Sequence, residues 1–592
     1  MSRGRGTHAP TLSRRTFVKG LAIGGIAAGF VGRGRAVRAE PSERQPSPVL
    51  SGTDFDLTIG ETLVNFTGAP RVAHTINRSL PAPTLRWREG DTVTLRVSNT
   101  LSDDDASIHW HGILLPANMD GVPGLSFDGI GPGETYVYRF HVRQAGTYWY
   151  HSHSAFQEQL GLYGPLIIDP LEPEPFQYER EHVVMLTDWT DEAPERVFAT
   201  LKKRSDYYNF HQRTLGDFFR DVRRQGWGTA LADRSAWGEM RMTPTDLADV
   251  SGHTYTYLLN GATPAGNWTG LFRPGERVRL RVINGSAMTY FDLRIPGLKM
   301  TVVAADGLPV HPVTVDEFRI AVAETLDVIV EPLGQEAFTI FASSVDRTGY
   351  ARGTLAVREG LSAAVPALEP RPQLTMADMG HGGTGHGMEH DASGQGEHAA
   401  SADPHAAHGA AAHEEGMLSH PASERRNPLV DMQTMTPAPR LDDPGIGLRD
   451  TGRTTLTYGA LRSVFDDPDG REPARTIELH LTGHMERFAW SFDGVKFSDA
   501  TPVRLTYGER LRIVLVNDTM MMHPIHLHGM WSDLEDEHGR FLVRKHTIDM
   551  PPGTRRSYRV TADALGRWAY HCHLLFHMEA GMFREVRVEE GT

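Results

Sequence analysis

Cysteine is almost absent from this chain: among 592 residues, Cys572 alone carries a thiol. An internal disulfide is therefore excluded, and a disulfide-stapled scaffold with it. Beyond its N-terminal segment the chain also lacks a run of about 18 apolar residues, so we expect no stable membrane insertion. Basic residues are outnumbered, with 60 Lys and Arg against 74 Asp and Glu and a formal charge of -14. This excess of acid disfavours nucleic acid and anionic membranes as partners.

The N-terminus predicts export. Residues 13–19 (SRRTFVK) match a twin-arginine signal, residues 21–31 form a short apolar stretch, and residues 37–39 offer a small-residue cleavage site. A basic anchor helix is the alternative, but the apolar stretch is too short to span a bilayer. We therefore predict a signal peptide at residues 1–39 and a periplasmic protein exported by the twin-arginine route.

Three segments share one pattern, a turn followed by an alternating strand that ends in Asn. They are residues 85–99, 273–284 and 507–517. The period is too long for a solenoid, so each copy should belong to a separate domain. Alternating strands bounded by Gly, Pro and Asp predict an all-β fold built from β-sandwiches. Between residues 188 and 248 this pattern breaks, and residues 198–203 and 217–224 are predicted helical, as an addition to the second domain.

A stretch of different composition divides the second and third copies. Between residues 361 and 440 Gly, Ala, Ser and Pro dominate, and the stretch is rich in His and Met. Such a composition cannot bury enough apolar surface to fold alone, so we predict a disordered His/Met-rich linker. Thioethers favour Cu(I) and imidazoles accept both oxidation states, so the linker could gather copper; a solvated spacer is the alternative.

The single cysteine lies among potential metal ligands. Cys572 is flanked by His571 and His573, with His577 five residues further on and Met582 five beyond that. With one His from upstream, these residue types form the ligand set of a blue-copper centre. In a strand, Cys572 would point to one face and both flanking histidines to the other. The segment would then connect two metal sites.

Three further His-x-His pairs have the spacing that places both rings on one face of a strand. If His523 belongs with Cys572, eight paired histidines remain, enough for three more metal ions: His109, His111, His151, His153, His526, His528, His571 and His573. The pairs fall only in the first and third repeats. The second site should therefore lie between those two domains, a common location for such sites.

In order and separation these motifs resemble those of the multicopper oxidases, which reduce dioxygen to water at a trinuclear copper cluster. Residues 205–210, 246–252 and 284–292 are similar to the periplasmic copper-resistance oxidases of the CopA/PcoA type, and the similarity extends along the whole chain. The resemblance implies three cupredoxin-like Greek-key domains. With the linker, the predicted division is 40–172, 173–360, 361–440 and 441–592.

The resemblance also implies four copper ions and assigns their ligands. The type 1 copper would be held by His523, Cys572, His577 and Met582, and the type 2 copper by His109 and His526. The paired type 3 coppers would be held by His111, His151, His153, His528, His571 and His573. Electrons would pass from Cys572 through His571 and His573. Zinc also binds His and Cys, but it needs no axial Met and no eight further histidines in pairs.

The implied activity is one-electron oxidation of a substrate, Cu(I) to Cu(II), coupled to reduction of dioxygen to water, in copper resistance. Two alternatives stay open: a laccase-type phenol oxidase with an organic reductant, and a periplasmic copper-sequestering protein. Dioxygen and the reductant are the expected small-molecule partners, and periplasmic copper-handling proteins are candidate protein partners.

The roles of three features stay open. Asp120 aligns with an acid that serves the cluster in relatives and could relay protons, but an Asp before Gly121 also favours a turn. Some cuprous oxidases carry a carboxylate directly after the histidine equivalent to His577, where this chain has Met578 and then Glu579, so the second proton donor stays open. Two methionine groups could form a Cu(I) path or fill core gaps: Met240 with Met242, and Met520, Met521 and Met522.

Overall fold

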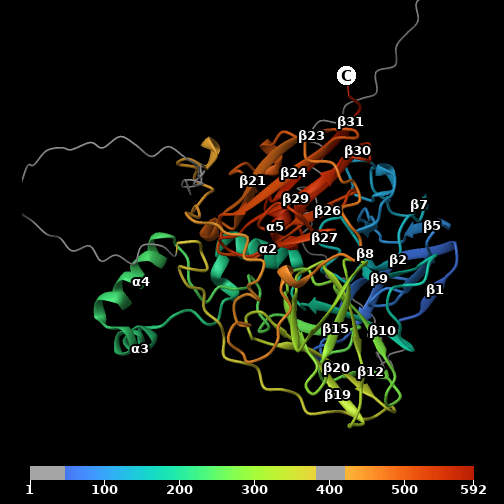
Figure 1. The fold of residues 1–592 in the computed structure, drawn as a ribbon, viewed down its shortest axis with the longest axis horizontal. Helices are drawn as coiled ribbons and strands as arrows, with labels where there is room; N and C mark the ends of the chain where they lie inside the picture. The colour runs from blue at the N-terminus through green and yellow to red at the C-terminus, as the bar shows by residue number, and fades with distance from the viewer. Residues whose placement is uncertain (1–46, 382–419, 592) are drawn as a thin grey trace, which may run out of the picture.

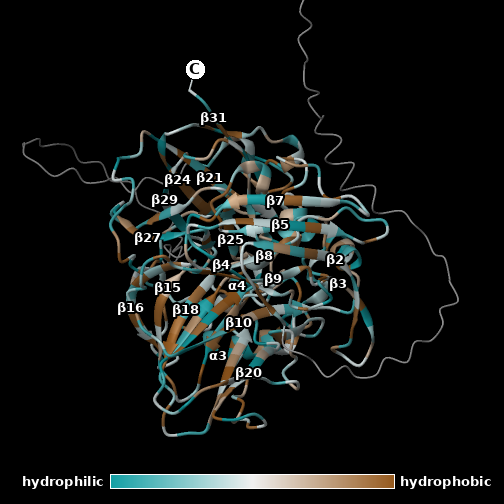
Figure 2. Ribbon diagram, turned by 90° about the vertical axis from the view of Figure 1, so that its right-hand side faces the viewer, coloured by the Kyte–Doolittle hydropathy of each residue, from teal (hydrophilic) through white to brown (hydrophobic). Residues whose placement is uncertain are grey.

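A computed structural model describes residues 47–381 and 420–591. Its strands form six sheets, two from each third of the described chain, which confirms the predicted all-β class and the three sandwiches (Figure 1). Hydrophobic residues concentrate along the strands, with hydrophilic loops around them (Figure 2). Within the described ranges, no helix combines the length and the apolar content needed to cross a bilayer. The predicted signal at residues 1–39 lies outside the described residues.

The first sandwich pairs a four-stranded sheet, ordered β3-β2-β5-β7, with a five-stranded sheet, ordered β1-β4-β9-β8-β6. Two short strands of the second sheet, β6 and β8, carry the first histidines. The strands are β1 (Val49–Ser51), β2 (Asp54–Val64), β3 (Arg71–Ile76), β4 (Thr84–Arg88), β5 (Thr92–Asn99), β6 (His109–His111), β7 (Thr135–His141), β8 (Gly146–His151) and β9 (Tyr163–Asp169).

The second sandwich has a six-stranded sheet, ordered β11-β10-β13-β18-β15-β16, and a five-stranded sheet, ordered β12-β20-β19-β14-β17. Its strands are β10 (Arg180–Trp189), β11 (Thr256–Leu259), β12 (Trp268–Leu271), β13 (Val278–Asn284), β14 (Phe291–Arg294), β15 (Met300–Ala305), β16 (Leu308–Val315), β17 (Glu317–Ile320), β18 (Thr325–Val330), β19 (Ala337–Ser344) and β20 (Tyr350–Ala356).

The third sandwich repeats this plan, with sheets ordered β22-β21-β24-β29-β26-β27 and β23-β31-β30-β25-β28. Its strands are β21 (Arg475–His484), β22 (Ala489–Phe492), β23 (Val503–Thr506), β24 (Arg510–Asn517), β25 (His523–Leu527), β26 (Ser532–Glu535), β27 (Phe541–Lys545), β28 (Thr547–Met550), β29 (Arg555–Thr561), β30 (Gly566–Cys572) and β31 (Phe583–Glu589). A short helix, α5 (Leu575–Glu579), follows β30.

The repeated Asn has the same task in all three sandwiches. It ends β5, β13 and β24, and each side chain is fully buried. Its amide nitrogen donates to two backbone carbonyls of the loops that cross the end of the sheet, which satisfies buried groups that would otherwise lack partners. The pairs are Asn99 with Asp104 and Ile130, Asn284 with Thr289 and Ile320, and Asn517 with Met521 and Met550.

The segment after β10 is helical, as predicted, in α2 (Pro194–Lys203) and α3 (Leu215–Gln225), and also in α4 (Trp227–Glu239). Helices α3 and α4 project from the body of the molecule (Figure 1). Helix α2 lies against the third sandwich, because Lys202 Nζ donates to the carbonyl of Phe488 at 2.7 Å and Phe198 stacks on Phe576. The insertion therefore contacts the third sandwich as well as the second.

Both ends of the predicted linker are packed on the fold. Met379, Met432 and Thr434 are buried, and Thr434 Oγ1 donates to the carbonyl of Met379 at 3.2 Å. The prediction from composition placed these residues in a disordered linker. A few buried apolar side chains instead hold residues 374–381 and 420–440 against the third sandwich. The remainder, residues 382–419, lies outside the described residues, with six of the eight linker histidines.

Candidate metal centres

Cys572 ends β30, and its sulfur faces two imidazoles. Cys572 Sγ lies 3.5 Å from His523 Nδ1 and 3.9 Å from His577 Nδ1, and these two nitrogens are 3.1 Å apart. The pairing of β25 with β30 sets Ile525 opposite Cys572, and α5 turns the chain back so that His577 reaches the same point. These three side chains form one group of potential ligand atoms.

The far nitrogens of both rings are held by other residues. His577 Nε2 donates to Asp249 Oδ2 at 2.7 Å, and His523 Nε2 is 2.7 Å from Thr519 Oγ1. Trp490 stacks on the His577 ring at 4.1 Å. Such outer contacts fix the orientation and tautomer of metal-binding imidazoles. Both rings therefore leave Nδ1 facing the sulfur.

Met582 is fully buried beside this group. Its backbone carbonyl accepts from the Cys572 amide at 3.1 Å, and its own amide donates to the carbonyl of His577 at 3.0 Å. Burial raises the pKa of the Cys572 thiol well above its usual range. A bound metal ion would instead hold the sulfur as thiolate.

The eight paired histidines meet where the first and third sandwiches adjoin. β6 and β8 set His109 opposite His151, and β25 and β30 set His526 opposite His571. Three contacts between Nε2 atoms join residues more than 40 positions apart: His153 to His571 at 3.3 Å, His528 to His571 at 3.0 Å, and His151 to His573 at 3.3 Å. All are buried except the partly buried His153.

Five of these rings are held in the tautomer that suits a metal. Each donates Nδ1–H to a carbonyl or carboxylate oxygen, which leaves the Nε2 lone pair free: His109, His151, His526, His528 and His571. The Nε2 atoms of His109 and His526 and the Nδ1 atoms of His111 and His573 are buried without a hydrogen bond. Unpaired buried nitrogens are costly unless an ion takes the lone pair.

Burial also favours the neutral form of seven imidazoles in the cluster. It lowers the pKa of His571 to about 3. It lowers the pKa of six others well below the usual value, with neighbouring imidazoles adding to the effect: His111, His151, His153, His526, His528 and His573. Neutral imidazole is the form that binds metal ions. The residues present therefore fit a group of soft or borderline transition-metal ions.

Asp120 contacts histidines of both sandwiches. Its Oδ2 accepts from His528 Nδ1 at 2.8 Å, and its backbone carbonyl accepts from His109 Nδ1, also at 2.8 Å. The following Gly121 has φ +80°, and a Cβ there would lie 1.8 Å from the carbonyl oxygen of Ile108. Asp120 therefore occupies a turn and also holds two rings of the cluster.

Several residues at these centres escaped the sequence analysis. Besides Asp249 and Thr519, Glu158 Oε2 lies 2.8 Å from His151 Nδ1, and His546 Nδ1 lies 3.3 Å from His111 Nε2. His546 stands directly before Thr547 and has no partner at the His-x-His spacing. Only the three-dimensional packing brings it to the cluster.

A buried ionic network holds the second and third sandwiches together next to His546. Lys545 Nζ lies 3.0 Å from Asp306 Oδ2 and 3.1 Å from Glu324 Oε1. Asp306 Oδ2 also accepts from the backbone amides of His546 and Thr547, both at 3.1 Å. The second sandwich, which has no histidine pair, thus fixes the strand beside the cluster.

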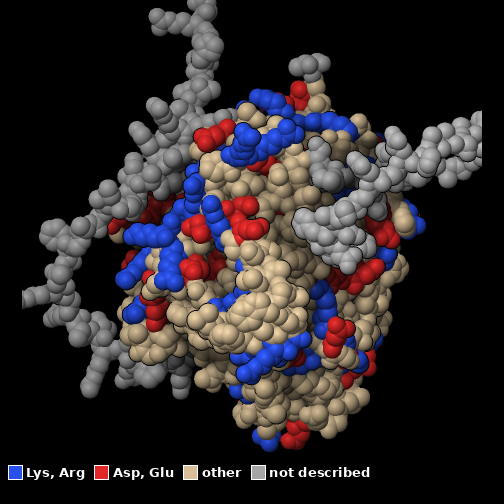
Figure 3. Space-filling view, turned by 90° about the vertical axis from the view of Figure 1, so that its left-hand side faces the viewer, with Lys and Arg blue, Asp and Glu red and all other residues tan. Residues whose placement is uncertain are grey.

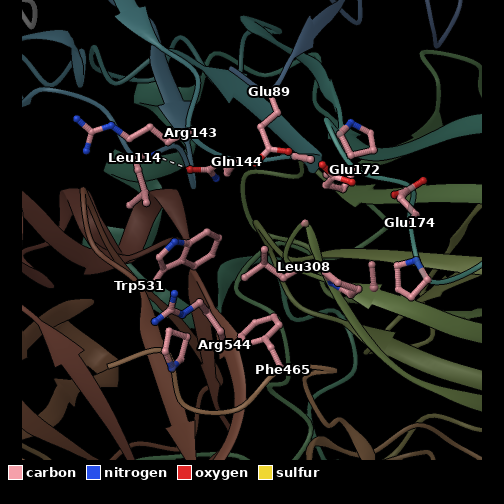
Figure 4. A pocket seen from close by; sticks show the side chains of 18 of the residues that line it. Glu89, Leu114, Arg143, Gln144, Glu172, Glu174, Leu308, Phe465, Trp531 and Arg544 are labelled. Carbon is pink, nitrogen blue, oxygen red and sulfur yellow. Dashed lines mark hydrogen bonds between the residues drawn. The ribbon is translucent and has the colours of Figure 1, made fainter. Parts of the chain in front are cut away.

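A cavity of about 970 Å³ opens where the three sandwiches meet (Figure 4). Gln144 and Leu114 from the first sandwich, Leu308 from the second and Trp531 from the third face it. Gln144 Nε2 donates at 2.7 Å to the carbonyl of Gly112, next to His111, and Trp531 stacks on His546. The cavity therefore reaches the residues that surround the histidine cluster.

The other candidate residues are placed as follows. Met520, Met521 and Met522 are buried in the core, and Met240 and Met242 are partly buried. Burial raises the pKa of Glu579 to about 7. On the face shown in Figure 3, acidic and basic side chains are interspersed, without a continuous basic surface.

The fold and the two ligand groups define a multicopper oxidase, and comparisons place the chain in that family. Sequence models of the multicopper oxidases match residues 58–173, 180–360 and 470–592. The chain belongs to this family, a group of oxidoreductases that use copper and dioxygen.

Among its relatives, the chain is similar to copper resistance protein A of Escherichia coli. The two are 68% identical, over 98% of this chain and 99% of the relative. A copper resistance protein A homolog of Pseudomonas syringae pv. tomato is 69% identical with the same coverage. The fold is similar to that of Fet3p, a multicopper oxidase that functions in iron import, with a TM-score of 0.62, 18% identity and coverage of 91% of both chains.

Proposed function

We propose that this oxidase carries four copper ions and oxidises Cu(I) to Cu(II) in copper resistance. His523, Cys572, His577 and Met582 hold the type 1 copper, and His109 and His526 the type 2 copper. The type 3 pair is held by His111, His151, His153, His528, His571 and His573. The distances between Cys572, His523 and His577, and the unpaired nitrogens of the eight-histidine cluster, support this assignment.

The bound coppers would supply one-electron oxidation at one centre and four-electron reduction of dioxygen at the other. In sum, four Cu(I), one dioxygen and four protons give four Cu(II) and two waters. The chain's own contribution is the connection between the centres. Cys572 is bonded through the backbone to His571 and His573, whose rings lie in the other cluster. Electrons therefore have a short covalent route.

Asp120 acts in this scheme by positioning. Its hydrogen bonds to His528 and His109 hold ligands from two sandwiches in register. This arrangement favours a role at the cluster over a turn-forming role alone. The cavity between the sandwiches offers dioxygen, water and protons a way to the same cluster.

The observation that favours a cationic substrate over a phenol is the contact between His577 and Asp249. Both type 1 imidazoles are fully buried, so neither presents an edge on which an aromatic ring could dock. The distal nitrogen of His577 contacts a carboxylate, and Asp249 Oδ1 is buried without a hydrogen bond. Asp249 is itself buried, so its carboxylate would favour a cationic substrate through its electric field and not by direct contact. The relatives named copper resistance protein A support a role in copper resistance.

We also propose that the protein works in the periplasm after twin-arginine export. Residues 13–19 carry the twin-arginine motif. Copper-handling proteins of that compartment are the proposed partners. A protein with one thiol suits such a space, because copper would occupy that thiol and protect it from oxidation.

The test compares two reductants in the purified protein. We expect one dioxygen consumed for every four Cu(I), and a higher kcat/KM for Cu(I) than for a neutral phenol. A higher kcat/KM for the phenol would overturn the Cu(I) assignment in favour of a laccase. Deletion of residues 382–419, which spares the packed ends of the linker, tests sequestration. Copper tolerance that survives Cys572→Ser but not this deletion would show that storage is the function.

A further inference from the structure

A second group of metal-binding side chains lies in the third sandwich, apart from both copper centres. It consists of His420, Glu424, His480 and Asp518. His420 Nδ1 lies 3.2 Å from Glu424 Oε2 and 3.3 Å from Asp518 Oδ2. His480 Nδ1 lies 2.6 Å from Asp518 Oδ2 and 3.6 Å from Glu424 Oε1. The four side chains thus alternate imidazole and carboxylate around a common centre.

The group is assembled by distant parts of the chain. His480 lies on β21, Asp518 follows β24, and Glu424 ends the short 3-10 helix η3 (Ala422–Glu424). Glu424, His480 and Asp518 are buried, and the side chain of His420 is 12% exposed. His420 is the first described residue after the His-rich segment 382–419. The group therefore lies where that segment rejoins the fold.

The outer contacts of both imidazoles select the tautomer of a metal ligand. His420 Nε2 donates to the carbonyl of Thr434 at 3.0 Å, and His480 Nε2 faces Glu478 Oε1 at 3.4 Å. Both partners only accept, so each Nε2 carries a proton and each Nδ1 faces inward. This is the usual outer arrangement of metal-binding histidines. Burial lowers the pKa of His480, but Asp518 and Glu478 raise it more, to about 10, and Asp518 raises the pKa of His420. The inward nitrogens therefore also attract a proton, whose place a bound cation would take.

The carboxylates are held in the same way. Asp518 Oδ1 accepts from the Thr434 amide, and Glu424 Oε2 accepts from Gln433 Nε2, both at 2.7 Å. Glu424 Oε1 is buried and has no hydrogen bond. A buried carboxylate oxygen without a donor is costly, and a cation between the four side chains would satisfy it. Hydrogen bonds within the cluster do not satisfy this oxygen, whereas a bound cation would.

Spacing and charge indicate the kind of ion. Neighbouring ligands in the square-planar or tetragonal arrangement of Cu(II), each about 2.0 Å from the ion, are about 2.8 Å apart. The four neighbouring separations here run from 2.6 to 3.6 Å. Two carboxylates balance a divalent charge. The group contains no sulfur, which disfavours Cu(I), and sites of nitrogen and oxygen bind Cu(II) more tightly than the other divalent metals of the first transition row. We propose that His420, Glu424, His480 and Asp518 bind an additional Cu(II) ion.

This site does not depend on the proposed substrate, but it lies close to the type 1 ligands along the chain. Asp518 precedes Thr519, whose hydroxyl is 2.7 Å from His523 Nε2. A cation held by Asp518 is therefore one residue from a group that orients a type 1 ligand. Occupation of the site should raise the potential of the type 1 centre.

The experiment measures copper per chain in full-length holoprotein loaded with Cu(II) and freed of loose metal. The variants are Glu424→Gln and His480→Gln, and His538→Gln is the matched control, since its side chain is 65% exposed in the same sandwich. We expect each site variant to lose one copper equivalent with the blue absorbance per chain unchanged, and the control to match wild type. The linker histidines are present in every sample, so the difference isolates the site.

Equal copper contents in Glu424→Gln and wild type would overturn the proposal. Loss of one zinc equivalent instead of copper would overturn the assignment to Cu(II). A variant that fails to fold would lose its blue absorbance. In that case the proposal is tested on wild type, by measuring its melting temperature with and without added Cu(II). We expect an added equivalent of Cu(II) to raise the melting temperature of wild type and of His538→Gln alike; no rise in either would refute the site.

Discussion

The hydrogen bond from His577 to Asp249 offers a direct test of how electrons reach the proposed type 1 centre. Asp249→Ala removes the acceptor at 2.7 Å from a fully buried imidazole, and the side chain of Asp249 is itself 2% exposed. Hydrogen bonds to charged groups contribute about 1.5–3 kcal/mol. We therefore expect kcat/KM for Cu(I) to fall about 10- to 150-fold.

The reduction potential should change in a defined direction. A carboxylate near the ligand stabilises the oxidised, more positive state, so its removal should raise the potential of the type 1 centre. If the whole interaction favoured the oxidised state, the rise would reach about 60–130 mV. Asp249→Asn keeps an acceptor without the charge. Because charge-assisted hydrogen bonds are about twice as strong as neutral ones, the rise in potential in Asp249→Asn should be about half of the rise in Asp249→Ala.

The assay combines redox titration of the blue band with stopped-flow oxidation of Cu(I). Asp246→Asn is the matched control, because Asp246 is buried three residues away and does not hydrogen bond to His577. An alanine variant at position 249 with wild-type potential and wild-type kcat/KM would refute the argument.

Three further outcomes are expected. Cys572→Ser should abolish the blue band and the oxidase activity while the fold persists, and dioxygen consumption by this variant would contradict the proposed electron route. Gly121→Ala should lower stability by more than about 1–2 kcal/mol, the cost of a left-handed backbone with a side chain, because its Cβ also meets Ile108; Gly133→Ala, at φ +77° in open space, supplies the control in thermal unfolding. Burial raises the pKa of Glu181, but Arg281 and Arg86 lower it more, to about 2, so its stabilisation is present above about pH 4.3 and lost as pH falls towards 2. Glu181→Gln should therefore cost up to about 3 kcal/mol in denaturant unfolding at pH 7 and little at pH 2, and a pH-independent difference would contradict this cause.

The residues that the sequence reveals are those with a regular spacing. His-x-His pairs and the repeated strand ending in Asn follow the two-residue period of a strand, so they are visible in one dimension. Asp249, Glu158 and Thr519 have no such period, because they reach the proposed copper ligands from loops. Their placement depends on how three sandwiches pack, which sequence spacing does not encode.

Composition did not reveal which parts of the predicted linker pack on the fold. Gly, Ala and Ser dominate residues 361–440 on average, but Met379 and Met432 are buried against the third sandwich. Single apolar anchors in a polar stretch have too little weight in an average to be recognised. The sequence also predicted the helical character of α2 but not its contact with Phe488 in the third sandwich.

The histidine cluster joins residues that are far apart in the chain, and this separation sets the order of assembly. His153 and His571 are 418 positions apart, and Asp120 and His528 are 408 apart. During synthesis the histidines of the first sandwich therefore lack their partners from the third sandwich until the last strands have been synthesised. A complete cluster therefore forms only after both end sandwiches have folded. Copper supplied to a nascent or truncated chain would find only half of the proposed ligands in place.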